Sequence, residues 1–150
     1  FTKINAQVQL AAPLSKRLLL RIDSSAQYST KPLLAPEEFA LGGSRIGRAF
    51  DFNEATGDHG IGTMVELSYR VGDTGRGPKS LNLFAYMDGG GAFRRHSSPG
   101  LPDEQWLASA GAGARFAALG FLWSAEVGVP IAHRNAETGP RAFFSVTRVF

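Results

Sequence analysis

Apolar and polar residues alternate along most of the chain, in segments of roughly ten residues. In the segment 3–11, one face would carry Ile4, Ala6, Val8 and Leu10, and the other Asn5, Gln7 and Gln9. This period of two is typical of a β-strand with one apolar face. The pattern predicts about seven strands, over residues 3–11, 17–28, 62–71, 81–91, 106–117, 121–132 and 141–150.

The length of these segments and the charges on their polar face favour a membrane-spanning barrel over a soluble sandwich. Strands of soluble sandwiches usually run about five or six residues, whereas barrel strands that cross a membrane need about ten. The polar face carries charged residues that suit a wet lumen, namely Arg17, Arg21, Asp23, Glu66, Arg70, Asp88, Arg115 and Glu126. We therefore predict an all-β fold, a transmembrane antiparallel β-barrel.

Seven strands would leave two open edges, and an open edge cannot face lipid. Residues 1–150 are therefore expected to form the C-terminal part of a longer barrel. The chain also opens at Phe1 within an alternating segment, as a piece of a longer protein would. Trp106 and Trp123 lie at predicted strand starts, where an interfacial aromatic girdle would place them, although a sandwich core would also bury them.

Composition narrows the classes of function. The chain holds 18 glycines, 11 phenylalanines and 43% hydrophobic residues, which favours strands and turns over helices. No apolar run reaches the ~18 residues of a transmembrane helix. The net charge of +3 is spread along the chain rather than gathered in a basic stripe, so no nucleic-acid partner is predicted. Without cysteine, histidines at metal spacing or a catalytic motif, we predict no enzyme activity, no metal and no cofactor.

A long predicted loop, residues 31–60, contains the stretch "GGSRIGRAFDFNEATGDHG" with a single central arginine, Arg48. A guanidinium is always charged and offers a planar fork of donors, so it could bridge carboxylates on a barrel wall. Period two places Glu66 and Asp88 on the lumen face of neighbouring strands. We expect Arg48 to fold inward and contact Asp88 first and Glu66 second; the alternative is an ordinary solvated loop arginine. Glycines near the tip would permit positive φ and close approach to the wall, or make only a turn.

These features together resemble the C-terminal region of two-partner secretion transporters, the FhaC/ShlB/HecB type (TpsB), which are relatives of the barrel-assembly protein BamA. The loop stretch "EEFALGGSRIGRAFDF" supplies the family's tip residues Gly42, Gly43, Arg48 and Phe50, and "GDHG" followed by "VEL" continues the pattern. The stretch "FAYMDGGG" supplies Phe84, Asp88 and Gly90, in the context of the family's inner-wall aspartate. One position departs from the family, since Ala49 follows the arginine where a glycine is usual.

The resemblance implies a bacterial outer-membrane protein, the C-terminal seven or so strands of a barrel of about sixteen, with the long loop folded into the lumen. Such a transporter moves a large secreted protein, a haemolysin or an adhesin, and contacts outer-membrane lipids. The resemblance also implies that the barrel-assembly machinery reads the terminal Phe150 together with Val146 and Phe144, although an ordinary strand could end in the same way.

Other functions remain open from the residues alone. A BamA-like insertase or assembly factor would use the same fold, and a neighbouring gene for a large cargo would argue against it. A soluble all-β module, with carbohydrate as its ligand, is a further alternative, which free solubility of the full-length protein in water would favour.

Overall fold

The structure is a computed structural model that describes residues 2–71, 80–96, 100, 102–133 and 139–148. The terminal Phe150 therefore lies outside the described residues. In these ranges the chain forms β1 (Lys3–Pro13), β2 (Leu18–Ser29), the 3-10 helix η1 (Ala35–Glu37), β3 (Phe39–Leu41), β4 (Ala55–Gly57), β5 (His59–Val71), β6 (Ser80–Phe93), β7 (Glu104–Ala118), β8 (Phe121–His133) and β9 (Arg141–Arg148). No helix in the described ranges has both the length and the apolar character to cross a membrane.

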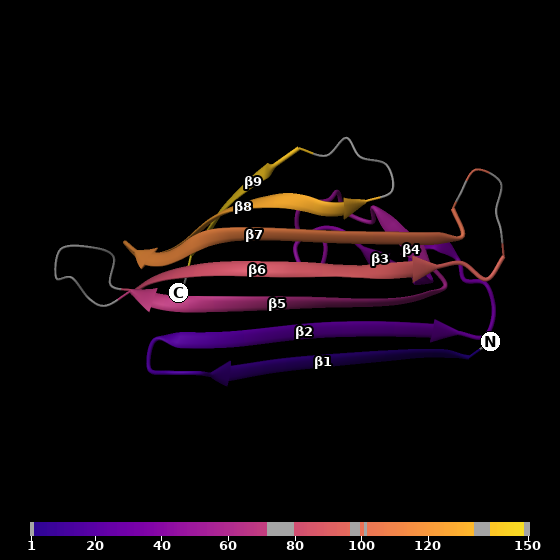
Figure 1. Ribbon diagram of the computed structural model, residues 1–150, viewed down its shortest axis with the longest axis horizontal. Coiled ribbons are helices and arrows are strands. Elements are labelled where there is room, and N and C mark those ends of the chain that lie inside the picture. Colours follow the sequence, from indigo (N-terminus) through magenta and orange to yellow (C-terminus); the bar gives the residue numbers. More distant parts are fainter. Residues whose placement is uncertain (1, 72–79, 97–99, 101, 134–138, 149–150) are drawn as a thin grey trace.

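Seven long strands form one sheet, in the order β1-β2-β5-β6-β7-β8-β9, and every neighbouring pair is antiparallel. Figure 1 shows them side by side in this order. The predicted number of strands and their alternation are confirmed, and the observed bounds differ from the predicted ones by a few residues. For example, β5 begins at His59 rather than at Gly62, because Gly60 and Ile61 continue the ladder with β2 and β6.

The register brings the charged positions of neighbouring strands onto one face. Glu66 of β5 lies opposite Arg21 of β2 and Tyr86 of β6. Asp88 of β6 lies opposite Ser109 of β7. Because side chains alternate between the two faces of a strand, residues paired across the ladder share a face. The charged residues of the middle strands therefore share the inner wall, where Met64 lies opposite Asp88, and the outer face is apolar.

A tight turn and a β-bulge lie between β7 and β8. Leu119 and Gly120, with φ of 55° and 77°, form the tight turn between β7 and β8, where two successive positive φ values match the twist of a hairpin. The register between β7 and β8 shifts at Ala108 and Ser109, and Ser109 then lies opposite Pro130. A bulge is one of the few places in a sheet that accepts proline, because the ladder hydrogen bond is already missing there.

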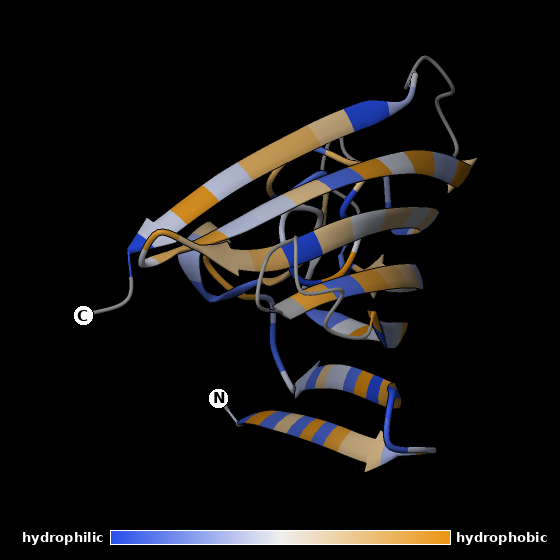
Figure 2. Ribbon diagram, turned by 90° about the vertical axis from the view of Figure 1, so that its left-hand side faces the viewer, coloured by the Kyte–Doolittle hydropathy of each residue, from blue (hydrophilic) through white to orange (hydrophobic). Residues whose placement is uncertain are grey.

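The segment between β2 and β5 does not run freely over the surface. It crosses the concave face of the sheet, as Figure 2 shows, and contains η1 and the antiparallel pair β3–β4. The sequence analysis predicted only loop here, because strands of three residues are too short to show a period. Between this segment and the sheet lies the apolar core, which consists of Phe39, Leu41, Ile46, Phe50, Ala55, Met64, Ala92 and Leu107.

Candidate functional site

Arg48, at the tip of the long loop, is buried against the inner wall, with its side chain 9% exposed. One terminal nitrogen, Nη1, donates to Glu66 Oε2 at 3.1 Å and lies 3.6 Å from Glu126 Oε2. The guanidinium carbon stands 4.3 Å from the centre of the Tyr86 ring, a cation–π distance. Its Nε is buried and has no hydrogen-bond partner among the described residues. The tip is therefore held by an ion pair and an aromatic face at once.

Glu66 is the centre of this charge network, and its side chain is 1% exposed. Arg115 of β7 donates two hydrogen bonds to the Glu66 carboxylate, from Nη1 to Oε1 at 2.7 Å and from Nη2 to Oε2 at 2.9 Å. Arg21 adds a longer ion pair of 3.8 Å from the other side. A buried carboxylate needs such partners, and the two-pronged arginine contact is the strongest kind. Glu66 is thus neutralised by the wall itself as well as by the loop.

Asp88 positions the backbone of the tip. Its Oδ2 accepts the backbone N–H of Arg48 at 3.1 Å, and its Oδ1 accepts a hydrogen bond from the hydroxyl of Ser109. Ser109 Oγ in turn accepts the backbone N–H of Ala49 at 3.4 Å. Asp88 and Ser109 therefore fix two successive peptide groups of the loop against the wall.

The expected order of the Arg48 contacts is wrong for the guanidinium, which pairs with Glu66, whereas Asp88 accepts a backbone N–H. The reason lies in the register. Asp88 is level with the loop backbone, and Glu66, opposite Tyr86, lies one pair further along the same face. A long arginine side chain carries its charge past the first carboxylate to the second.

The two glycines of the tip motif adopt the positive φ that the sequence analysis allowed for, +103° at Gly42 and +96° at Gly43. A Cβ built on Gly42 would lie 2.0 Å from the carbonyl oxygen of Asp51, so a side chain has no room there. Phe50 is 2% exposed and belongs to the apolar core. Ala49 is fully buried and has no positive φ, so its backbone does not require the glycine that the family resemblance led us to expect.

Glycines on the inner wall make room for the aromatic rings beneath the arginines. A Cβ built on Gly111 would lie 2.6 Å from the Tyr86 ring, and one on Gly113 would lie 2.5 Å from the Phe84 ring. Phe84 in turn lies 3.7 Å beneath the guanidinium carbon of Arg115. The glycines of β7 therefore let both rings lie flat on the wall under their cations.

Four site residues were not assigned to the tip contact from the sequence: Tyr86, Ser109, Arg115 and Glu126. The period of two places all four on the polar face of their strands, so this period was the available signal. It could not show which of these residues meet, because that depends on the register between strands.

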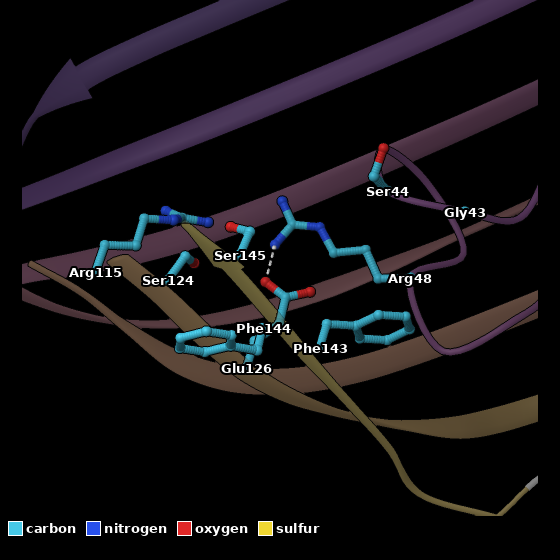
Figure 3. A pocket seen from close by; sticks show the side chains of 9 residues that line it. All are labelled: Gly43, Ser44, Arg48, Arg115, Ser124, Glu126, Phe143, Phe144 and Ser145. Atoms are coloured by element: carbon cyan, nitrogen blue, oxygen red, sulfur yellow. Dashed lines mark ion pairs between the residues drawn. The ribbon is translucent and has the colours of Figure 1, made fainter. Parts of the chain in front are cut away.

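A pocket of about 340 Å³ lies beside Arg48 between the loop tip and strands β8 and β9. Figure 3 shows Arg48 reaching over Glu126 at its wall, with Arg115 on the far side. The pocket is lined by Gly43, Ser44, Arg48, Arg115, Ser124, Glu126, Phe143, Phe144 and Ser145. In the described part of the chain, no three histidine, aspartate or glutamate side chains gather as a metal site.

Two exposed ion pairs flank the tip. Arg45 Nη2 lies 2.9 Å from Asp23 Oδ1, and Arg141 contacts Asp51 at 2.6 and 3.2 Å. The hydrogen bond from Arg141 holds the pKa of the Asp51 carboxyl below its ordinary value. Because both pairs are open to solvent, they contribute little to holding the loop.

The described residues of the expected assembly signal lie on the outer face of the last strand. Phe144 is 67% exposed and Val146 is 43% exposed, and the Phe144 ring lies 5.9 Å from that of Trp123. Trp123 is near the start of β8, at the opposite end of the sheet from Trp106. Both tryptophans lie on the outer face, beside other aromatic rings.

Comparison with known proteins shows which family and which solved structure this chain resembles. Residues 1–116 match the model of the haemolysin secretion/activation protein family ShlB/FhaC/HecB. Among solved structures, CdiB from Escherichia coli is similar, with a TM-score of 0.81 and 22% sequence identity. The similarity covers 96% of this chain and 27% of the CdiB chain, so the chain spans about a quarter of that protein's length. No curated protein sequence matches.

The similarity to CdiB confirms the predicted all-β fold class, and the sheet is an open section of an antiparallel barrel within the described residues. The family match covers more than half of the chain and includes the long loop, Glu66 and Asp88. The family is one of transporters rather than of enzymes. The chain therefore belongs to the ShlB/FhaC/HecB family of haemolysin secretion/activation proteins.

Proposed function

We propose that this chain is the C-terminal part of a bacterial outer-membrane transporter that secretes one large partner protein through the barrel lumen. Membership of a secretion family supports this over the insertion of other outer-membrane proteins and over carbohydrate binding. The rest of the barrel, of about sixteen strands in all, would pair with the free edges of β1 and β9.

The outer face of the sheet supports a position in the membrane. Large apolar side chains point away from the inner wall and are exposed, among them Val8, Val65, Leu83, Met87, Val127 and Phe144. In water such a continuous apolar face would cause aggregation, whereas lipid covers it. Trp106 and Trp123, near opposite ends of the strands, would mark the two interfaces. Phe144, Val146 and Phe150 would be contacted by the barrel-assembly machinery.

The observation that carries the proposal is the buried contact between the loop tip and the wall. A loop that only closed the barrel could do so with apolar contacts, yet this one places Arg48 in a network with Glu66, Glu126 and Tyr86. Such a network fixes one orientation of the tip in the lumen. An extended cargo would pass along this polar wall, from which the tip must at least partly move.

Secretion by the full-length transporter tests this function. We expect Arg48→Ala and Asp88→Ala each to reduce secretion of the cognate partner by about tenfold, the factor that ~1.4 kcal/mol corresponds to. Arg45→Ala is the matched control, because Arg45 is in the same loop but its ion pair is exposed, and secretion should be unchanged. If both tip variants secreted normally while present as folded barrels, the proposed role of the tip would be wrong.

A further inference from the structure

The long loop contacts the barrel at a second place, far from its tip. The two ends of the loop, residues 30–41 and 55–58, meet the segment that follows β6 at the rim of the sheet. We call the contacts of Glu38, Thr56 and Asp58 with Arg94 and Arg95 the rim clamp. The sequence analysis quoted Glu38 and Asp58 only within the motif stretches and predicted no contact for any of these residues, because none of them lies in a periodic segment.

Arg94 forms the inward half of the rim clamp. Its guanidinium holds Glu38 with two hydrogen bonds, at 3.0 and 3.3 Å, and donates a third to Thr56 Oγ1 at 2.7 Å. The side chains of Arg94 and Glu38 are each only 10% exposed. Glu38 precedes β3 and Thr56 lies in β4, so one guanidinium ties the incoming and outgoing arms of the loop to the wall.

Asp58 forms the other half, and it is 4% exposed. Its Oδ1 accepts the backbone N–H of Leu33 at 2.5 Å, and its Oδ2 accepts the backbone N–H of Arg95 at 2.8 Å. The Arg95 side chain continues outward to the carbonyl of Ser29 and the hydroxyl of Tyr28, both at 2.8 Å. Asp58, itself buried, thus joins the start of the loop, its end and the β6–β7 connection in one partly buried cluster.

The rim clamp and the tip contact share no residue, and the fold separates them. The β3–β4 pairing ends at Leu41 and Ala55, which closes off residues 42–54 as a smaller loop that carries Arg48. Positive φ values occur near both ends of this smaller loop, at Gly42, Gly43 and Asn53, and also at Gly47 beside Arg48. Sharp bends of this kind are where a segment can swing without disturbing the strands that flank it.

We propose that Arg94 and Asp58 hold the base of the loop independently of the tip, so that residues 42–54 can leave the wall while residues 30–41 and 55–58 stay at the rim. Arg94 and Asp58 are thus positioning residues for the loop. That the tip moves during secretion rests on the proposed function, but the rim clamp itself does not depend on it.

Two buried alanines report separately on the tip and the base. Ala49 is 0% exposed and lies beside Arg48, whereas Ala55 is 1% exposed and lies in β4. The chain has no cysteine, so Ala49→Cys or Ala55→Cys introduces one thiol into it. The full-length protein, with any cysteine elsewhere replaced, is labelled in outer membranes with a small maleimide, and the rate at each thiol is measured.

We expect each variant to change the labelling rate at one of the two thiols and not at the other. Arg48→Ala should raise labelling at Ala49→Cys by about tenfold, the factor for ~1.4 kcal/mol, and leave Ala55→Cys within about twofold of its starting rate. Arg94→Glu should do the reverse. Adding Glu38→Arg to Arg94→Glu should restore protection at Ala55→Cys, because the ion pair re-forms with its charges exchanged.

Several outcomes would overturn the proposal. Equal acceleration at both thiols by either variant would show that the loop moves as one unit. Protection at Ala55→Cys that survives Arg94→Glu would show that no clamp exists. Heat-modifiability of each variant on gels confirms a folded barrel before labelling. Since no cargo is present, these outcomes bear on the rim clamp alone, and loss of secretion in the tip variants is a separate test of the proposed function.

Discussion

Replacing Glu66 by glutamine is expected to lower the free energy of unfolding by about 3 kcal/mol. The carboxylate is 1% exposed and accepts hydrogen bonds from Arg115 at 2.7 and 2.9 Å and from Arg48 at 3.1 Å. Hydrogen bonds to charged groups contribute about 1.5–3 kcal/mol each, and glutamine keeps an acceptor oxygen but not the charge. Because Arg115 is 27% exposed, water recovers part of the loss, which keeps the total near the lower end of the range for a broken buried pair.

Removing Arg48, the partner of Glu66 on the loop, should lower the free energy of unfolding by a smaller amount. In Arg48→Ala the Glu66 carboxylate is still held on both oxygens by Arg115, so no buried charge is left alone. We expect about 1.5 kcal/mol for this variant, from the lost hydrogen bond and the lost contact with Tyr86. Glu126→Gln is the matched control for the glutamate change, because Glu126 is 15% exposed and lies 3.6 Å from Arg48, and it should cost less than ~1 kcal/mol.

Urea unfolding of the full-length protein in lipid vesicles measures these differences, with tryptophan fluorescence as the signal and with curves taken from both the folded and the unfolded side. The expected order of destabilisation is Glu66→Gln first, Arg48→Ala second and Glu126→Gln last. Equal losses for Glu66→Gln and Arg48→Ala would refute the reasoning, because they would show that Arg115 does not neutralise Glu66 once the loop arginine is gone.

Three further changes test the packing of the loop by the same unfolding measurement. Ala49→Gly, which introduces the residue usual in the family, should destabilise by about 0.5–1 kcal/mol, because no positive φ needs the glycine; a gain would contradict this. Gly60→Ala should cost about 1–3 kcal/mol, since its Cβ would lie 1.9 Å from a loop aromatic ring, whereas Gly139→Ala meets nothing within 4 Å and should be neutral. Ser109→Ala removes a donor to Asp88 and should cost about 1 kcal/mol.

The strands and their faces were predictable because the alternation is strict and the strands are long. A slip of one residue would turn Glu66 and Arg115 toward the apolar side, so the sequence itself excludes other choices of face. The loop arginine was also recognisable, since the tip motif and two inward carboxylates were visible without coordinates. What these signals specify is which face a residue occupies.

The partners within that face were not predictable. Arg115 meets Glu66 across β6, a strand that lies between their own, so their contact depends on the register of two ladders and on the reach of a long side chain. The pair β3–β4 is too short for a period, and Arg94 and Asp58 follow strands rather than lie within them. The contacts of these residues can be identified only once the folded backbone is known.

The distribution of charge and apolar contact along the loop is what allows it to be anchored and movable at once. At the base, burial of Phe39 and Leu41 accompanies the buried pair of Arg94 and Glu38, and both are lost if the base leaves the wall. When the tip leaves the wall, the Glu66 carboxylate that Arg48 contacted is still neutralised by Arg115, and the Arg48 guanidinium enters a wet lumen. Its release therefore avoids the penalty of stranding a buried ion. The burial of Phe50 and Ile46, about 2 kcal/mol each, still favours the closed position, so a passing cargo must supply free energy of this order to move the tip.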